Sequence, residues 1–386
     1  MKPEVIVIGG GVIGSSITYH LARDGVKVRQ LEKGSIANQG AASRASAGGI
    51  RLNNRDPREL PLAKASILRW QTLEEELEAD LEYMPSGQIM LYDHRFSIEM
   101  IQEQVKEDQK NGIPAQIVNQ NSLKELIPYI SPSYTKGIFY PSGGQANGLL
   151  TAIAFSSAAR RLGAEIVTGT EVYSIKKENN AVTGVQTSSG FIPCDTVINA
   201  AGVWAPALHE KLGLSLSQIK PFCHQMSATF AAPAILPGPT ISAKDTKISL
   251  KQTIDGRIRA GGGYPTKPGP DEYSGVFNEK SLKQQRATVL SIVPEIEKYE
   301  IDFTYYGAEA HCIDEIPILG EVPEVSGYLI AAGFSGHGFT ISPGVGQVIS
   351  DIVQKKSPSI SIEGLTIDRS FSIENKNDGA IRHFPG

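Results

Sequence analysis

The sequence contains few cysteines, no long apolar run and no dense basic segment, and each absence excludes a class of protein. Cys194, Cys223 and Cys312 are far apart and lack the spacing of a zinc site or of a redox pair. We therefore expect neither a disulfide framework nor a bound metal. No segment approaches the roughly 18 apolar residues of a membrane-spanning helix, so we also expect no membrane span.

The charges are nearly balanced. The chain has 37 lysines and arginines against 41 aspartates and glutamates, which gives a net charge of −4 at pH 7. Without a basic excess, neither nucleic acid nor an anionic membrane is an expected partner. The first predicted strand begins at residue 4 or 5, which leaves no room for a signal peptide before it. These features together predict a cytoplasmic protein.

The chain does contain a glycine-rich turn close to its start. The apolar run Val5–Ile8 leads into Gly9, Gly11 and Gly14 in a G-x-G-x-x-G pattern, and a helical segment follows. This arrangement lets the backbone approach a pyrophosphate at the start of the helix. We expect Gly9 to permit the turn, Gly11 to permit the close approach and Gly14 to permit helix packing.

An acidic residue ends the second apolar run. Glu32 comes 18 residues after Gly14, directly after the strand predicted over residues 26–31. A carboxylate at this place binds the ribose of an adenosine without a phosphate on that sugar. The alternative is a glycine-rich turn without a ligand. We prefer a ligand because strand, turn, helix, strand and acid follow one another in the required order.

A second segment of glycine and other small residues spans 40–51. Its backbone can lie close to a flat or phosphorylated group because few side chains intervene. The alternative is a flexible loop, but the position after Glu32 favours contact with the ligand.

At 386 residues the chain exceeds the size at which one core usually stops growing, so we expect two lobes. Segments with βαβ character alternate with segments rich in strands and turns, so the predicted domains are discontinuous. The predicted ranges are 1–50, 148–217 and 326–365 for the nucleotide-binding domain, 51–147 and 218–325 for the substrate domain, and 366–386 for a polar tail.

Further segments carry a family resemblance. Besides Glu32 and the 43–49 loop, they are Thr170–Val172, Asn199–Trp204 and Ala331–Phe339, the last ending in Gly-Phe-Ser-Gly-His-Gly-Phe. With these segments the chain resembles the FAD-dependent D-amino-acid oxidase superfamily, from about its fourth residue to its 355th. It is most similar to the sarcosine oxidase, glycine oxidase and D-amino-acid or proline dehydrogenase β-subunit group.

The resemblance implies an α/β fold, in which a Rossmann-like FAD-binding domain is interleaved with an α+β substrate domain built on a mixed, mainly antiparallel sheet. It implies FAD rather than NAD as the cofactor. Val172 would contact adenine through its main chain, and the helix after Phe339 would direct its N-terminus at the flavin. The implied cofactor-binding residues are Gly9, Gly11, Val12, Ile13, Gly14, Glu32, Lys33, Ser43, Arg44, Ala47, Gly48, Gly49, Val172, Ala201, Gly202, Trp204, Gly307, Gly333, Gly336, His337, Gly338, Phe339 and Thr340.

The same resemblance implies a reaction. FAD-dependent oxidation of a secondary amine or amino acid would form an imine by hydride transfer to the flavin, and water would hydrolyse the imine. One alternative is an accessory flavoprotein subunit of a multi-chain amino-acid or opine dehydrogenase. Another is an NAD-linked dehydrogenase. The expected partner is a small-molecule substrate, with either partner subunits or a homo-oligomer also possible.

Three candidates for catalysis each have a second explanation. Arg51 aligns with an arginine near the substrate carboxylate in monomeric sarcosine oxidases, but could make a phosphate or structural contact. His337 could transfer a proton or simply pack between two glycines. Tyr264 could line the pocket or belong to the core.

Two departures from the family pattern alter the expected pocket. Glu309 stands where glycine oxidases and D-amino-acid oxidases have an arginine in a Gly-x-Arg pattern, and Thr340 stands where sarcosine oxidases have a lysine. Both changes remove positive charge from the place expected for a substrate carboxylate. Glu309, the fourth catalytic candidate, would attract a cationic group if it faced the flavin, and would otherwise be a surface or paired carboxylate. The identity of the substrate is left open.

The family resemblance also bears on flavin attachment and on the electron acceptor. The cysteine that anchors flavin in monomeric sarcosine oxidases would fall near Gly307 rather than at Cys312, so we expect non-covalent FAD. The lysine with which those enzymes activate oxygen has no clear counterpart. Lys251, Arg257 and Arg259 lie in the corresponding region, and both oxidase and dehydrogenase activity stay open.

Overall fold

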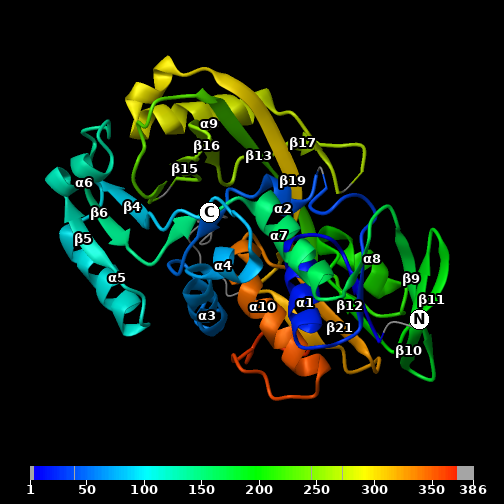
Figure 1. Cartoon of the computed structure of the whole chain (residues 1–386). Helices are drawn as coiled ribbons and strands as arrows, with labels where there is room; N and C mark the ends of the chain where they lie inside the picture. The colour runs from blue at the N-terminus through cyan, green and yellow to red at the C-terminus, as the bar shows by residue number, and fades with distance from the viewer. Residues whose placement is uncertain (1–3, 39, 245, 272, 372–386) are drawn as a thin grey trace.

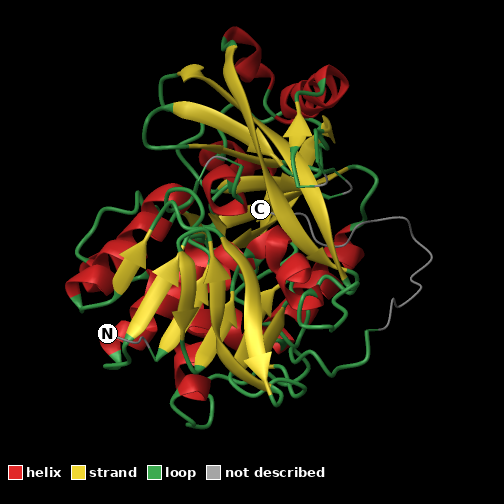
Figure 2. Ribbon diagram, turned by 90° about the vertical axis from the view of Figure 1, so that its right-hand side faces the viewer, coloured by secondary structure: helices red, strands yellow, loops and turns green. Residues whose placement is uncertain are grey.

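The computed structural model describes residues 4–38, 40–244, 246–271 and 273–371. Its architecture consists of two large sheets with helices packed against them (Figures 1 and 2). No helix in these ranges combines the length and the apolar character needed to cross a membrane.

The six-stranded sheet has the order β20-β21-β12-β1-β2-β8, and its neighbours are parallel except for the antiparallel pair β20 and β21. The strand β1 is buried along its whole length, as expected for a continuous apolar run in a parallel sheet. The strand bounds are Val5–Ile8 for β1, Val28–Leu31 for β2, Glu165–Val167 for β8, Thr196–Asn199 for β12, Ile318–Glu321 for β20 and Tyr328–Ala332 for β21.

Three long helices form a layer beside this sheet, with α1 (Val12–Arg23) packed between α7 (Gly148–Arg161) and α10 (Gly338–Val353). The helix α3 (Leu60–Trp70) packs on α10. The indole Nε1 of the fully buried Trp70 donates a hydrogen bond of 2.9 Å to the backbone oxygen of Thr340. The segment after the 40–51 loop therefore shares a core with the nucleotide-binding elements.

The eight-stranded sheet has the order β19-β13-β16-β15-β14-β4-β6-β5 and is antiparallel except between β14 and β4. Its longest pairing joins β13 to β19, and both strands extend to the six-stranded sheet (Figure 1). The bounds are Gln88–Asp93 for β4, Gln116–Asn119 for β5, Tyr134–Tyr140 for β6, Ile219–Ala231 for β13, Thr240–Ala243 for β14, Ser249–Gln252 for β15, Arg257–Gly261 for β16 and Ile301–Cys312 for β19.

The remaining elements are short or peripheral. The small sheets comprise β3 (Gly49–Ile50) with β7 (Gly144–Gln145), β9 (Val172–Glu178) with β10 (Ala181–Thr187) and β11 (Gly190–Pro193), and β17 (Lys267–Pro268) with β18 (Gly275–Val276). The other helices are α2 (Ala42–Ala45), α4 (Leu73–Leu77), α5 (Ile98–Lys110), α6 (Gln120–Leu126), α8 (Ala205–Glu210), α9 (Glu279–Ile292), and the short η1 (Gly202–Trp204) and η2 (Pro294–Lys298).

The predicted fold class is confirmed, since a mainly parallel sheet with helices is joined to a mixed, mainly antiparallel one. One detail needs correction. The predicted substrate domain includes residues 318–325, but β20 pairs with β21 in the six-stranded sheet. The exact domain boundaries stay a prediction. Of the predicted tail, Arg369 is held by Asp314 at 2.9 Å, and residues 372–386 lie outside the described residues.

Candidate active site

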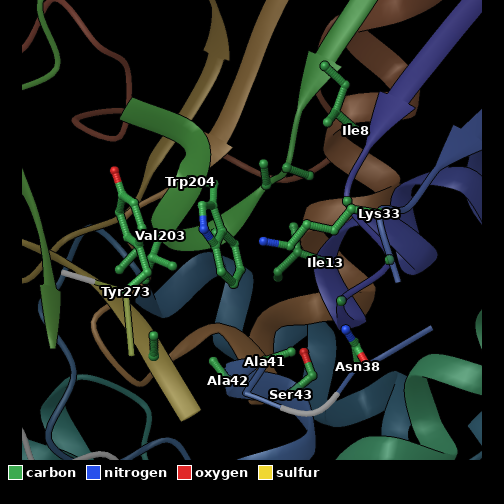
Figure 3. Close-up of a pocket in the computed structure, with 18 of the residues that line it drawn as sticks. Ile8, Ile13, Lys33, Asn38, Ala41, Ala42, Ser43, Val203, Trp204 and Tyr273 are labelled. Carbon is green, nitrogen blue, oxygen red and sulfur yellow. The ribbon is translucent and has the colours of Figure 1, made fainter. Parts of the chain in front are cut away.

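A cavity of about 510 Å³ opens at the carboxyl ends of β1, β2 and β12 and extends to β19 and the start of α10. The strand β1 lies between β2 and β12, so the order in which the chain adds strands to the sheet reverses at β1. Open α/β sheets bind ligands at such a switch point. Figure 3 shows part of the lining, with Ala41, Ala42 and Ser43 of the 40–51 segment on one side of the cavity.

The glycine-rich turn forms one wall of the cavity. Gly9 has a φ of +112°, and a Cβ there would collide with the backbone of Ala200. A Cβ at Gly14 would collide with the oxygen of Gly9, so the turn and the packing predicted for these glycines are present. At Gly11 the nearest atom to a built Cβ is Ser43 Oγ, at 3.2 Å. Gly11 thus leaves room for a ligand at the N-terminus of α1.

Glu32 lies at the carboxyl end of β2. Its Oε2 accepts a hydrogen bond of 2.7 Å from the backbone N–H of Gly10, and its Oε1 accepts one of 2.7 Å from Gly34. Each carboxylate oxygen keeps a second lone pair for a further donor. The Glu32 carboxylate is therefore oriented so that it can accept hydrogen bonds from the two hydroxyls of a ribose.

An aromatic wall lies near Glu32. Lys33 Nζ is 3.4 Å from the ring centroid of Trp204, and the rings of Trp204 and Tyr273 are 5.8 Å apart (Figure 3). Burial lowers the pKa of Lys33, against the opposing effects of nearby carboxylates. Val172 and Tyr173 complete this end of the cavity. It offers a flat apolar surface beside Glu32.

The opposite end lies between β19 and the start of α10. Ala308, Glu309 and Ala310 of β19 line it together with Gly336 and the first residues of α10. The N-terminus of a helix presents backbone N–H groups and a partial positive charge. This end can therefore stabilise negative charge on a bound ring system.

Glu309 faces the cavity and is the one predicted catalytic residue that lines it. Its Oε2 lies 3.1 Å from His311 Nε2 and 3.9 Å from His224 Nε2. Burial alone would raise the pKa of Glu309, but the hydrogen bond with His311 and the neighbouring histidines outweigh it and lower that pKa. Glu309 is therefore a carboxylate at neutral pH.

Arg51 and His337 do not line the cavity in the described structure. The guanidinium of Arg51 donates a hydrogen bond of 2.8 Å to the backbone oxygen of Asn53. His337 Nδ1 lies 2.9 Å from Glu59 Oε2, and both side chains are fully buried. Burial lowers the pKa of His337 well below its usual value, and burial beside Arg55 lowers that of Arg51 to about 9.

These contacts favour the structural alternatives for Arg51 and His337, whose side chains belong to a buried cluster behind the start of α10. Tyr264 lies in the core of the eight-stranded sheet, where its hydroxyl donates a hydrogen bond of 2.8 Å to Thr288 Oγ1. The catalytic roles of the three residues stay predictions.

The cavity brings together most of the predicted cofactor-binding residues. Those that line it are Gly9, Gly11, Val12, Ile13, Glu32, Lys33, Ser43, Val172, Ala201, Gly202, Trp204, Gly336, Gly338 and Phe339. Those outside its lining are Gly14, Arg44, Ala47, Gly48, Gly49, Gly307, Gly333, His337 and Thr340. Ala47 and Gly307 line a smaller neighbouring cavity, and Thr340 Oγ1 donates to the oxygen of Gly49 at 3.2 Å.

Several lining residues were missed from the sequence. Asp271, Tyr273 and Ser274 lie between β17 and β18 of a small two-stranded sheet, and Lys211 follows α8. They belong to no motif, so sequence spacing could not have placed them at the cavity.

A model of the FAD dependent oxidoreductase family, DAO, matches residues 4–352. The chain belongs to this family. It is 28% identical to the glycine oxidase of Geobacillus kaustophilus, over 95% of this chain and 97% of that protein. The solved L-proline dehydrogenase from P. horikoshii superposes with a TM-score of 0.87 and 28% identity, over 95% and 96% of the two chains.

Another relative is longer. The mitochondrial pyruvate dehydrogenase phosphatase regulatory subunit of Mus musculus is 27% identical over 99% of this chain, which spans only 44% of that protein. The shared part is therefore a unit that also occurs within larger proteins.

FAD is the cofactor of this family, and the cavity fits it. The bare turn at Gly11 and the N-terminus of α1 suit the pyrophosphate, Glu32 suits the ribose, and the start of α10 suits the flavin. The described lining does not include Cys194, Cys223 or Cys312, and non-covalent attachment of FAD stays a prediction.

Proposed function

We propose that the chain oxidises a small amine or amino acid to an imine, which water then hydrolyses. FAD supplies the hydride acceptor when it is bound. The observation that carries this proposal is a single cavity that runs from the ribose acid Glu32 to the start of α10, with Glu309 at the second end. The named activities of the glycine oxidase and proline dehydrogenase relatives support it.

The residues of the chain contribute position and electrostatics. Glycines at the two helix starts expose backbone N–H groups to the cavity, where they stabilise negative charge. Glu309 orients a polar or charged part of the substrate by accepting hydrogen bonds. Backbone and apolar side chains provide most of the remaining lining, so the chain contributes mainly by positioning the reacting carbon.

Anaerobic mixing of the purified holoprotein with candidate amines tests this function. We expect at least one secondary amine, proline or D-amino acid to bleach the flavin absorbance in the isolated chain. If the protein carries FAD but no amine bleaches it, the proposed function is wrong.

A second candidate is an accessory flavoprotein subunit that transfers electrons only with partner chains. The likeness to a phosphatase regulatory subunit favours it. It predicts that the isolated chain binds FAD without reacting with any amine. Size-exclusion chromatography with light scattering would show whether the chain forms a homo-oligomer instead of requiring a partner.

A further inference from the structure

The strands β13 and β19 place a compact polar cluster beside the cavity. In their antiparallel register Phe222 lies opposite Glu309, and His224 lies opposite Gly307. Side chains two residues apart share a face of a sheet, so His224, Glu309 and His311 project from the same face. One side-chain nitrogen or oxygen atom from each of the three lies within 4.8 Å of the others.

Phe222 fixes the two imidazoles of this cluster. Its ring centroid lies 4.4 Å from that of His224 and 5.4 Å from that of His311. The side chain of Glu309 is 18% exposed. The acceptor atoms are therefore held in place and are still accessible from the cavity.

His224 points to a missing ligand. It is 8% exposed, and neither of its ring nitrogens has a hydrogen-bond partner among the described residues. Burial is the main cause that lowers the pKa of His224 to about 4, so the imidazole is neutral at pH 7 and one nitrogen can accept a hydrogen bond. A buried polar group without a partner is costly, and a bound donor would remove that cost.

A small cavity of about 20 Å³ adjoins this cluster. His224 and Glu309 line it, and Glu309 and Gly336 also line the large cavity. A volume of roughly 10–15 Å³ is enough for one water molecule. The small cavity can therefore receive a group of about that size from a molecule that lies beside Glu309 at the α10 end of the large cavity.

The charges around Glu309 favour a cation. Among the described residues, its ion-pair partners within 4.0 Å are the two histidines and no lysine or arginine. The buried Arg55 instead lies 3.7 Å from Glu59, and Lys251 lies beside Gly48. Lys247 is the nearby lysine whose charge lowers the pKa of His224, but it makes no ion pair with Glu309 in the described structure. A substrate carboxylate placed here would be repelled by Glu309.

We propose that Glu309, His224 and His311 form a subsite for a second cationic group of the substrate, an ammonium. The Glu309 carboxylate and a ring nitrogen of His224 can accept N–H donors of an ammonium group, and His311, whose Nε2 lies 3.1 Å from Glu309 Oε2, orients that carboxylate. The chain would then prefer amines with a basic tail to amines with a carboxylate tail. This inference rests on the proposed function, because the other nitrogen of the same molecule is the one oxidised.

Three secondary amines that differ only in their tails test the subsite in the holoprotein. N-methylpropanediamine ends in an ammonium, N-methylbutylamine in a methyl group and N-methyl-β-alanine in a carboxylate. We expect anaerobic flavin reduction at low amine concentration to be at least about tenfold more efficient with the diamine than with the neutral amine, the magnitude of a charge-assisted hydrogen bond. The carboxylate should react least.

Glu309→Gln should remove the preference. The ratio of its efficiency with the diamine to its efficiency with the neutral amine should fall about tenfold relative to the unmodified protein. His311→Gln is the second variant and should shift the preference in the same direction. Glu321→Gln is the matched control, because Glu321 pairs with Lys355 at the surface. FAD content and circular dichroism verify that each variant is folded.

The outcomes separate the subsite from the function. If the carboxylate amine reacts best, or if Glu309→Gln leaves the preference unchanged, the subsite is wrong and the oxidation still stands. If no amine reduces the flavin, the proposed function fails and the subsite fails with it. Stoichiometric zinc in the purified holoprotein that is absent from Glu309→Gln would show a metal site instead and would also overturn the proposal.

Discussion

Lys251 is a buried lysine, and its burial in the folded protein disfavours the charged form of its amine. It is 3% exposed on β15, and its Nζ lies 3.2 Å from the position of a Cβ built at Gly48. Burial, reinforced by the positive charge of Arg259, lowers the pKa of Lys251 to about 7. Lys251 therefore titrates near neutral pH, whereas an exposed lysine stays charged.

This shift predicts a pH-dependent stability. Between about pH 7 and the ordinary lysine pKa of about 10.4, the unfolded chain holds a proton that the folded protein lacks, so stability rises with pH. Below about pH 7 both states are charged and the full cost of burial is present. Lys251→Met should thus be more stable than the unmodified protein at pH 6 by a few kcal/mol, about 1.4 kcal/mol for each pKa unit.

Urea unfolding at pH 6 and pH 9 measures this difference. The gap between Lys251→Met and the unmodified protein should narrow at the higher pH. Lys244→Met, which removes an exposed lysine, is the control and should leave the pH dependence unchanged. Parallel curves for the unmodified protein and Lys251→Met would contradict the assignment.

At this scale, the sequence could predict local roles but not the surroundings of single side chains. Glu32 was found because its role depends on a turn and a strand nearby in the chain. The burial of Arg51 depends on the start of α10, where Thr340 Oγ1 accepts a hydrogen bond of 3.3 Å from the backbone N–H of Arg51. The direction of Glu309 depends on the register of β13 and β19, which no local pattern specifies.

At the scale of elements, Gly9 and Gly11 have different roles in the turn between β1 and α1. The positive φ of Gly9 and its contact with Ala200 serve the fold itself. Gly11 has an ordinary φ of −73°, and a Cβ there meets only Ser43 Oγ. The absence of a side chain at Gly11 therefore leaves room for the ligand and is not required by the backbone conformation.

Alanine at each position should separate these roles. Gly11→Ala should leave the melting of the apoprotein nearly unchanged but weaken FAD binding by about tenfold or more, about 1.4 kcal/mol for each factor of ten. Gly9→Ala should impair folding before any ligand is added. Thermal melting by circular dichroism and FAD titration followed by flavin fluorescence give the two readouts. If Gly11→Ala bound FAD normally, the pyrophosphate would not pass this turn.

The elements themselves were predicted well where a strong periodicity or a motif marks them. The strand–turn–helix at the start and the final strand leading into α10 are present. The strand β20 was assigned to the wrong lobe because it is short and its pairing with β21 is an antiparallel return. Nothing in four residues indicates which of two sheets they join.

At the scale of the whole molecule, one cavity joins distant parts of the chain. Its lining includes the first turn, the 40–51 segment, β9 and the start of α10, together with Asp271, Tyr273 and Ser274. Ala308, Glu309 and Ala310 of β19 add the eight-stranded sheet to this lining. A bound FAD would therefore contact both sheets at once.

The attachment of FAD can be tested directly. Since the cysteines lie outside the cavity lining, we expect acid precipitation to release the flavin into the supernatant. Mass spectrometry of the denatured chain should then give the mass of the polypeptide alone. A yellow precipitate with an added flavin mass would contradict non-covalent binding.

Binding across both sheets also predicts a stabilisation of the entire fold by FAD. A ligand that binds only the folded state at 100 times its Kd adds about 2.7 kcal/mol. With an unfolding entropy of about 2 cal/mol/K for each residue, a chain of 386 residues should melt about 3 °C higher with FAD than without it. Differential scanning calorimetry of the reconstituted and apo forms measures the shift. Gly11→Ala should lose most of it at the same FAD concentration, because its ligand site is impaired while its fold is intact. Equal melting temperatures for the two forms of the unmodified protein would mean that FAD does not bind the folded chain at that concentration.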